Sequence, residues 1–239
     1  MKYNVTRLWP MAVLLAAVAA SAADLNTLTP EEKADGWKLL FDGTDTSGWR
    51  TCGRTDFPAQ GWVIEDGALK NVGGKKGGDL VTREKFTDFD FKFEWRISPG
   101  GNSGVKYLVT ESKNSKAGIG FEYQVLDDDK NEDAQNGPKR QAGALYYIIA
   151  PNKEKHLKPV GEFNEGEIIV RGNHVEQWLN GAKIVGCDLG SPSLLEAIAQ
   201  SKFSKLTWFG KKKATVLLLQ DHGDTAWYRN LKIKELKPE

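Results

Sequence analysis

Hydrophobic and polar residues alternate along much of this chain, which is the pattern of half-buried β-strands. In residues 89–97, aromatic or aliphatic side chains fill every odd position and polar side chains fill every even position. The alternation returns in residues 105–109, and strands are also expected over 168–171 and 216–222. Successive side chains of a strand point to opposite faces of its sheet. Each strand is therefore expected to present one face to a core and a polar face outwards.

Two hairpins and two short helices complete the predicted elements. Residues 62–70 turn at Asp66-Gly67 and residues 175–185 turn at Asn180-Gly181, two dipeptides that favour tight hairpin turns. Thr29-Pro30-Glu31 is a helix start, and residues 193–200 form a second short helical segment. Many short strands without long helices between them predict an all-β fold, an antiparallel β-sandwich or jelly roll with one or two short helices.

Residues 119–127 carry the most information about a functional site. Ile119, Phe121, Tyr123 and Val125 form an apolar face that is expected to cover a core. Gly120, Glu122 and Gln124 fill the other face with an acid, an amide and a glycine that leaves room for a ligand. Solvated strand faces more often carry Lys, Thr and Ser, so this face is a candidate binding site. The polar segment 127–141 that follows is predicted to be a loop of a length that is often functional.

The first 23 residues have the character of a signal peptide. Lys2 and Arg7 precede an apolar run over 11–20, and an A-x-A cleavage site follows, with cleavage expected near Ala22 or Ala23. The apolar run is too short for a membrane span, which needs roughly 20 residues. We therefore expect a periplasmic or secreted protein with one domain over residues 24–239; an N-terminal segment that stays attached as an anchor is the alternative.

Charge and cysteine content exclude some classes of function. Without Lys2 and Arg7, the 33 basic residues become 31 against 32 acidic ones, so charge gives no argument for a nucleic-acid or membrane partner. The run 211–213 of three lysines is interpreted as a solvated turn. Cys52 and Cys187 are the only cysteines. An exported protein can join them in a disulfide, but their spacing does not decide whether they meet.

The polar faces of several predicted strands carry groups suited to a sugar ligand. If these strands share one curved sheet, the groups line its open face. A mixture of acids, bases and amides suits a neutral polyhydroxylated ligand, and nearby aromatic rings offer surfaces for stacking. The polar groups are Glu94, Arg96, Lys106, Glu122, Gln124, Gln220 and His222, and the rings are Tyr146, Tyr147 and Trp208.

Each of these groups also has a purely structural interpretation. Glu94 and Arg96 can form an exposed ion pair that contributes little, and His222 can bond a carbonyl of the turn at Gly223. Asp127 lies five positions after Glu122, which places it on the opposite face unless a bulge intervenes. Residues 127–129, three adjacent aspartates, are either a solvated turn or a cation-binding loop.

The order of several motifs resembles the 3-keto-disaccharide hydrolase domain family over essentially the whole chain after the signal peptide. The motifs are Leu39-Leu40-Phe41-Asp42-Gly43 through Gly48-Trp49, Gly101-Asn102-Ser103-Gly104, Phe121 to Asp127, Gly161-Glu162-Phe163-Asn164, Leu219-Gln220-Asp221-His222-Gly223, and Tyr228 to Ile233. Position 163 is Phe where the family pattern has Trp. Each motif is weak alone, but their order and spacing are specific.

The resemblance implies a concanavalin A-like jelly roll and hydrolysis of glycosides that are already oxidised at C3. A C3 ketone acidifies the C2 hydrogen, so a base can remove that proton and the C1 substituent can then be expelled before water adds. In this hypothesis Glu122 and His222 transfer protons, and Asp127 or Glu94 orients other groups or binds a divalent cation. Substrate hydroxyls or the ketone would be held by Arg96, Asn102, Lys106, Gln124, Tyr146 and Gln220. An upstream sugar 3-dehydrogenase is the implied source of the substrate.

Two rival functions remain open on the sequence. Glu122-x-Gln124-x-x-Asp127 is similar to the Glu-x-Asp-x-x-Glu strand of retaining jelly-roll glucanases, although its central acid is an amide and its last acid is shorter. A non-catalytic carbohydrate-binding module needs aromatic rings and amides but no proton-transfer pair. A polysaccharide lyase is disfavoured, because a uronate substrate calls for a strongly basic cleft.

Overall fold

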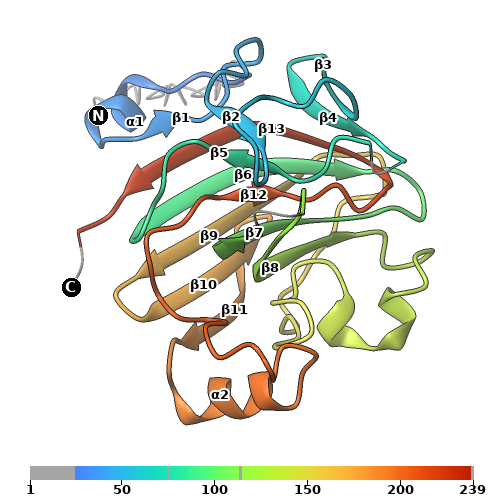
Figure 1. The fold of residues 1–239 in the computed structure, drawn as a ribbon, viewed down its shortest axis with the longest axis vertical. Coiled ribbons are helices and arrows are strands. Elements are labelled where there is room, and N and C mark those ends of the chain that lie inside the picture. The colour runs from blue at the N-terminus through green and yellow to red at the C-terminus, as the bar shows by residue number, and fades with distance from the viewer. Residues whose placement is uncertain (1–24, 75, 113–114, 238–239) are drawn as a thin grey trace, which may run out of the picture.

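A computed structural model describes residues 25–74, 76–112 and 115–237. The predicted signal peptide over 1–23 lies outside the described residues. Two antiparallel sheets pack face to face as a β-sandwich (Figure 1), which confirms the predicted all-β jelly-roll class. Among the described residues, no helix has both the length and the apolar character needed to cross a membrane.

The larger sheet has eight strands in the order β11-β10-β9-β6-β13-β4-β3, with β1 paired to β13. Their bounds are β1 Lys38–Leu39, β3 Trp62–Glu65, β4 Ala68–Val72, β6 Phe89–Ile97, β9 Asn164–Arg171, β10 His174–Leu179, β11 Ala182–Asp188 and β13 Thr225–Glu235. Both predicted hairpins are confirmed, as β3–β4 and β10–β11. Asp66, Gly67, Asn180 and Gly181 all have positive φ, as tight hairpin turns of this type require.

The smaller sheet has five strands in the order β2-β5-β12-β7-β8. Their bounds are β2 Trp49–Thr51, β5 Leu80–Thr82, β7 Asn102–Glu111, β8 Gly118–Leu126 and β12 Leu218–Leu219. The strand predicted over 216–222 is thus shorter than expected, although the backbone amide of Gln220 still donates to the Gly104 carbonyl at 2.9 Å. That bond holds residues 220–222 beside β7.

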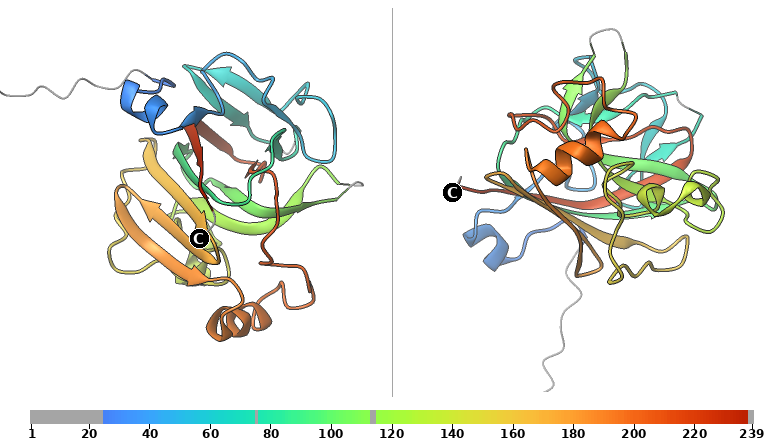
Figure 2. Two further views of the ribbon diagram at one scale, coloured as in Figure 1. Left: turned by 90° about the vertical axis from the view of Figure 1, so that its left-hand side faces the viewer. Right: turned by 90° about the horizontal axis from the view of Figure 1, so that it is seen from below.

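The helices and the 3-10 turns lie outside the two sheets. α1 spans Pro30–Ala34 and α2 spans Pro192–Ala199, close to the two predicted helices. The predicted loop over 127–141 contains the 3-10 turns η1 (Ala134–Asn136) and η2 (Pro138–Arg140). Figure 2 shows α2 and the segment after it projecting at one end of the sandwich. In Figure 1 the loop that carries η1 and η2 reaches the same end.

Aromatic side chains of both sheets fill the core between them. The inward faces of β6 and β8 meet there: the Phe93 ring packs edge-on against the Tyr123 ring, with centroids 5.3 Å apart. Phe121, Tyr123 and Val125 are fully buried, as the alternation predicts. Burial of such rings is the main source of stability in a sandwich of this size.

The prediction that Ile119 lies in the core is wrong, because its side chain is 44% exposed. Ile119 lies near the start of β8, beyond a β-bulge in the partner strand β7. Tyr107 pairs with Phe121, but the next pair is Thr110 with Ile119, and Leu108 adopts a positive φ of 51° within the bulge. The regular pairing of the two strands is therefore interrupted beside Ile119.

The two cysteines do not form a disulfide. Cys52 is buried in a small apolar cluster with Val81, Val109, Val216 and Leu218, which is separate from the main core. Cys187 lies on β11 in the other sheet, and both thiols are free. Burial raises the pKa of each thiol to about 12, so neither is a reactive thiolate at neutral pH.

Candidate functional site

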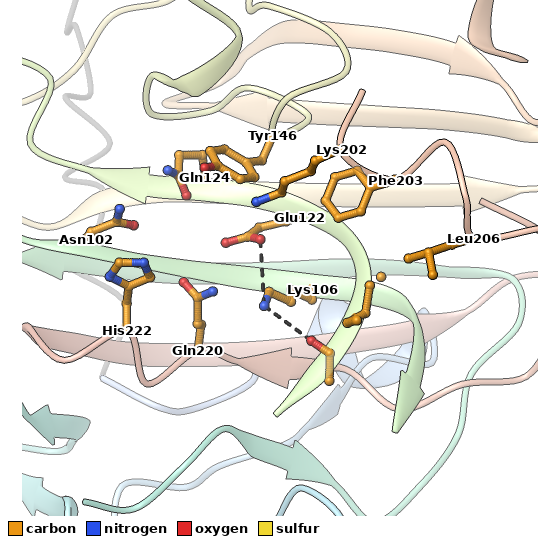
Figure 3. A pocket seen from close by; sticks show the side chains of 13 residues that line it. Asn102, Lys106, Glu122, Gln124, Tyr146, Lys202, Phe203, Leu206, Gln220 and His222 are labelled. Atoms are coloured by element: carbon orange, nitrogen blue, oxygen red, sulfur yellow. Dashed lines mark hydrogen bonds and ion pairs between the residues drawn. The ribbon is translucent and has the colours of Figure 1, made fainter. Parts of the chain in front are cut away.

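A pocket of about 360 Å³ opens beside β7, β8 and the segment that follows α2. The pocket floor comes from these two strands and from the segment after β12, and its side comes from Tyr146 and the loop after α2 (Figure 3). Its lining residues are Asn102, Lys106, Gly118, Ile119, Gly120, Glu122, Gln124, Tyr146, Lys202, Phe203, Leu206, Gln220 and His222.

The structure brings seven of the ten predicted site residues to this pocket. They come from segments distant in the sequence, and they meet because β8, β7 and the segment after β12 are neighbours in the smaller sheet. The seven are Asn102, Lys106, Glu122, Gln124, Tyr146, Gln220 and His222. The roles proposed for them stay predictions.

Glu122 lies at the centre of the pocket and is almost completely buried, at 7% exposure. It is the register partner of Lys106 on β7, and its Oε2 lies 3.7 Å from Lys106 Nζ. Burial raises the pKa of the Glu122 carboxyl, while the ammonium groups of Lys106 and Lys202 act in the opposite direction. The result is a carboxylate whose affinity for a proton exceeds that of an exposed glutamate.

The side-chain amide of Gln220 links Glu122 and Lys106. In the orientation that satisfies both neighbours, its nitrogen donates to Glu122 Oε1 at 3.2 Å and its oxygen accepts from Lys106 Nζ at 2.9 Å. Lys106 Nζ also donates to the Gly118 carbonyl at 3.3 Å. Buried charges are tolerated when they are paired and hydrogen-bonded, as this pair is.

Asp79 supports this arrangement from behind the pocket. It is 3% exposed, and its two carboxylate oxygens accept from the backbone amides of Gly118 and Asp221, each at 3.0 Å. Gly118 supplies the carbonyl that binds Lys106, and Asp221 directly follows Gln220 in the chain. Asp79 thereby fixes the backbone on both sides of the Glu122–Lys106 pair.

Gly104 on β7 provides the space in which the Glu122 side chain lies. A Cβ atom at position 104 would come within 2.3 Å of Glu122 Oε1 and 2.9 Å of its Cδ. The backbone of Gly104 is not in the left-handed region, so alanine is compatible with the strand itself.

Gly104→Ala is therefore expected to displace the Glu122 carboxylate. With the proton-transfer role that the sequence predicts for Glu122, this displacement should lower kcat at least tenfold, because a misplaced catalytic group costs heavily. The measurement is steady-state turnover of a substrate, together with thermal unfolding. Gly186→Ala on β11 is the matched control, because its new Cβ meets nothing within 4 Å. Unchanged kcat in Gly104→Ala would show that the position of Glu122 does not matter for turnover.

Gln124 has an acceptor aimed at the pocket that the protein itself leaves unpaired. The residue is 1% exposed, and its Nε2 makes a long bond of 3.4 Å to the Arg140 carbonyl. Within the described part of the chain, its buried Oε1 has no hydrogen-bond partner. An unsatisfied buried acceptor is costly, so this oxygen is well placed for a hydroxyl of a ligand.

Tyr146 and Lys202 close the side of the pocket. The Tyr146 hydroxyl donates to Asp133 Oδ2 at 2.8 Å, which fixes the ring, and Lys202 Nζ lies 4.4 Å from the centre of that ring. Lys202 is exposed as a residue, but its Nζ lies over the Tyr146 and Phe203 rings. Partial burial of the ammonium and the nearby Lys106 cation lower its pKa, while Glu122 opposes the shift.

Sequence reasoning missed Lys202, Phe203 and Leu206. They lie in an irregular segment after α2, where no periodicity assigns a side chain to a face. Ile119 was assigned to the core and instead lines the pocket. The lysine between a serine and a phenylalanine in residues 201–203 gives no local signal of a site.

Three predicted site residues lie elsewhere. Glu94 and Arg96 are on β6, which belongs to the larger sheet, so their polar face points away from the pocket. Glu94 accepts from Arg229 Nε at 2.7 Å, and the Arg96 guanidinium lies 4.1 Å from the centre of the Trp227 ring. The expectation that all the polar strand faces share one sheet is wrong at this point.

Asp127 has a structural position at the end of β8. It is 1% exposed, and its carboxylate accepts from the backbone amides of Gly100, Asp129 and Lys130 at 2.7, 3.0 and 3.2 Å. It therefore caps a turn and does not line the pocket. Tyr147 and Trp208, the other predicted stacking rings, are also absent from the pocket lining formed by the described residues.

The pocket does not fit the divalent cation considered from the sequence. Across the described ranges, no three His, Cys, Asp or Glu residues gather as metal ligands. The carboxylate that lines the pocket, Glu122, already lies between two ammonium groups. Hard cations prefer several oxygen ligands without competing positive charge, so no step of the mechanism below passes through a metal.

Comparison with known proteins agrees with the family resemblance of the sequence motifs. A family model described as the 3-keto-alpha-glucoside-1,2-lyase-like domain matches residues 36–234. A 3-keto-disaccharide hydrolase of Bacteroides thetaiotaomicron is 34% identical over an alignment 244 residues long, gaps included, and the alignment covers 90% of this chain and 83% of that protein.

Two crystal structures from Parabacteroides distasonis, both described as glycosyl hydrolases, share the fold. One is 34% identical, with a TM-score of 0.80, and the match covers 89% of this chain and all of that chain. The other is 28% identical, with a TM-score of 0.63, and the match covers 84% of this chain and 99% of that chain.

Proposed function

Because this chain belongs to the 3-keto-alpha-glucoside-1,2-lyase-like family, we propose that it cleaves glycosides whose sugar is oxidised to a ketone at C3. The relative from Bacteroides, named for a 3-keto-disaccharide, supports this substrate class. The reaction removes the C2 proton, expels the C1 substituent and then adds water at C1. The products are a free 3-keto sugar and the aglycone.

Glu122 is the base in this proposal. Burial raises the pKa of its carboxyl and so its proton affinity, while the ammonium groups of Lys106 and Lys202 favour the ionised form. It takes the C2 proton, and the electron pair of the C–H bond moves into an enolate over C2, C3 and the ketone oxygen. After elimination, the sugar has a C1–C2 double bond conjugated with the ketone, and water adds to C1. The added water loses one proton to the neutral amine of Lys202, the group that protonated the leaving oxygen. The protonated Glu122 returns its proton to C2, so both enzyme groups are restored.

The polar end of the pocket holds the ketone. His222, Asn102 and Gln220 lie on one side of Glu122 in Figure 3. A hydrogen-bond donor beside the ketone oxygen stabilises the enolate as its negative charge develops. His222 has this role here, which differs from the proton transfer expected from the sequence, while Gln124 Oε1 accepts from a sugar hydroxyl.

Lys202 lies on the other side of Glu122 and donates a proton to the leaving oxygen on C1. Its ammonium has a lowered pKa, which makes it a better acid than an ordinary lysine. The order His222, Glu122, Lys202 along the pocket then matches the order C3, C2, C1 along the sugar ring. In the proposed binding mode, each group therefore lies beside the sugar atom on which it would act.

The observation that carries the proposal is that Glu122 is the single carboxylate among the described residues lining the pocket. Glycosidases that act through an oxocarbenium-like transition state use two carboxyl groups at the scissile bond. Asp127, the second acid of the glucanase alternative, caps a turn instead. One base with flanking donors is what elimination from a 3-keto glycoside requires.

The pH dependence tests the role of Glu122 as base. Since the carboxylate is the active form, kcat/KM should fall as the pH drops through a pKa above the ordinary value of 4.5. Lys106→Met removes a cation that favours the carboxylate, so this acid limb should move to higher pH, by about one unit or more. Lys92→Met is the control, because Lys92 on β6 forms a Lys–Glu pair with Glu167 on β9 of the other sheet, and it should leave the limb in place.

The direct test is turnover of a 3-keto glucoside and of its unoxidised parent, read by release of the free sugar. We expect turnover of the oxidised substrate alone. Sugar binding by calorimetry without turnover of either compound would instead indicate a carbohydrate-binding module.

We also propose that the protein works outside the cytoplasm after removal of residues 1–23, downstream of an enzyme that oxidises C3 of the sugar.

A further inference from the structure

The pocket changes in character from one end to the other, and this change carries an inference about the substrate. On the side of His222 and Asn102, the lining is made of amides and an imidazole. On the opposite side, beyond Lys202, lie Phe203 and Leu206 (Figure 3). Ile119 also lines the pocket and lies on β8 on the side of Glu122 away from Gln124. Glu122 lies between the two ends.

The apolar end is a built feature of the fold. Ile119 is 44% exposed and lines the pocket near the start of β8, beside the bulge in β7 at Leu108. The Phe203 ring stacks on the Phe209 ring with centroids 4.1 Å apart and an angle of 9°, which holds Phe203 in place at the pocket wall. An exposed isoleucine beside a fixed ring makes a surface that gains from contact with another apolar group.

This surface is poorly suited to a second sugar. A sugar needs several planar hydrogen-bonding groups around its ring hydroxyls. Among the described lining residues on this side, Lys202 is the one polar side chain, and it is already directed towards Glu122. Branched aliphatic side chains cannot replace the hydrogen bonds to water that the hydroxyls of a sugar lose on binding.

We propose that this enzyme prefers 3-keto glycosides with an apolar aglycone, such as an alkyl or aryl group, which lies against Ile119, Phe203 and Leu206. The inference rests on the proposed function, because it places C1 and its leaving oxygen at Lys202. It differs from the disaccharide in the name of the Bacteroides relative, in which the aglycone is a sugar.

The experiment compares three 3-keto glucosides of one anomeric form: methyl, n-hexyl and a disaccharide. Methanol and hexanol are similar leaving groups, so their difference reports contact with the aglycone. Partial burial of five additional methylene groups predicts a kcat/KM for the hexyl compound about tenfold or more above that for the methyl compound. A disaccharide that is turned over faster than the hexyl glycoside would overturn the inference.

Matched variants test whether the apolar wall causes the preference for the hexyl aglycone. Ile119→Ser should reduce the hexyl-to-methyl ratio by about threefold or more, because it removes a large part of the apolar wall. Ile64→Ser is the control: Ile64 is 40% exposed against 44% for Ile119, but it lies on β3 in the other sheet. Because both side chains are exposed, neither change threatens the fold. An unchanged ratio in Ile119→Ser would contradict the assignment of the aglycone to this wall.

A wrong reaction assignment and a wrong aglycone assignment give different experimental results. If none of the three 3-keto glucosides is turned over, the reaction assignment is wrong, and calorimetry with hexyl and methyl glucoside still tests the apolar wall. Tighter binding of the hexyl compound that Ile119→Ser weakens would support the wall as a ligand site. Equal affinities would overturn it.

Discussion

Replacing Glu122 by Gln is expected to lower kcat/KM for a 3-keto glucoside by about three orders of magnitude, which is within the range for loss of a general base. The amide keeps the shape of the side chain but cannot accept the C2 proton. The measurement is release of free 3-keto sugar, with thermal unfolding as a check that the protein is folded. That check is needed because Lys106 loses its carboxylate partner in this variant.

Glu94→Gln is the matched control for this prediction. Glu94 is also a glutamate on a strand with a cationic partner, Arg229, but it lies in the larger sheet and away from the pocket. Its replacement should change stability slightly and turnover little. Comparable losses of turnover in the two variants would mean that Glu122 has no special part in the chemistry.

Replacing Lys202 by Met is expected to have an effect that depends on the leaving group. An alkoxide leaves poorly unless its oxygen is protonated, so alkyl 3-keto glucosides should lose about a hundredfold in kcat/KM. A 4-nitrophenolate needs no proton to leave, so the corresponding glycoside should lose less than about fivefold. Rates with both substrates in the same variant give the comparison.

Lys205→Met is the control, because Lys205 lies in the same segment but does not line the pocket. It should leave both rates close to those of the unmodified protein. If Lys202→Met slows the alkyl and nitrophenyl substrates equally, Lys202 does not protonate the leaving oxygen, and its contribution is limited to the charge beside Glu122.

The centre of the site could be predicted because it depends on local alternation. Residues 119–125 alternate on a strand, so Phe121 and Tyr123 had to face the core while Glu122 and Gln124 faced the other way. Lys106 alternates in the same manner on β7, and the two strands pair directly. Alternation fixes the face of a side chain without any knowledge of distant contacts.

Alternation does not tell which sheet a strand joins, and this explains the errors at Glu94 and Arg96. β6 pairs with β9 and β13, so its polar face lies on the outside of the opposite layer. The error at Ile119 is of a different kind, since it lies near the start of β8, where a bulge at Leu108 of β7 interrupts the regular pairing of the two strands. Such a bulge leaves no clear mark in the sequence.

Residues beyond the ends of strands were the hardest to place. Asp127 follows β8 directly, and its carboxylate turns back to cap backbone amides, which a count of positions cannot show. Lys202 and Phe203 depend on how an irregular segment packs across the end of the sandwich. The apolar wall of the pocket was therefore visible only in three dimensions.

The central claim is that cleavage begins with loss of the C2 proton of an oxidised sugar. The most direct measurement is the kinetic isotope effect on kcat/KM with a 3-keto glucoside that carries deuterium at C2. The account predicts a normal primary effect, clearly above one, and no turnover of the parent glucoside with its C3 hydroxyl intact. An isotope effect of one, together with equal turnover of the unoxidised parent, would contradict it.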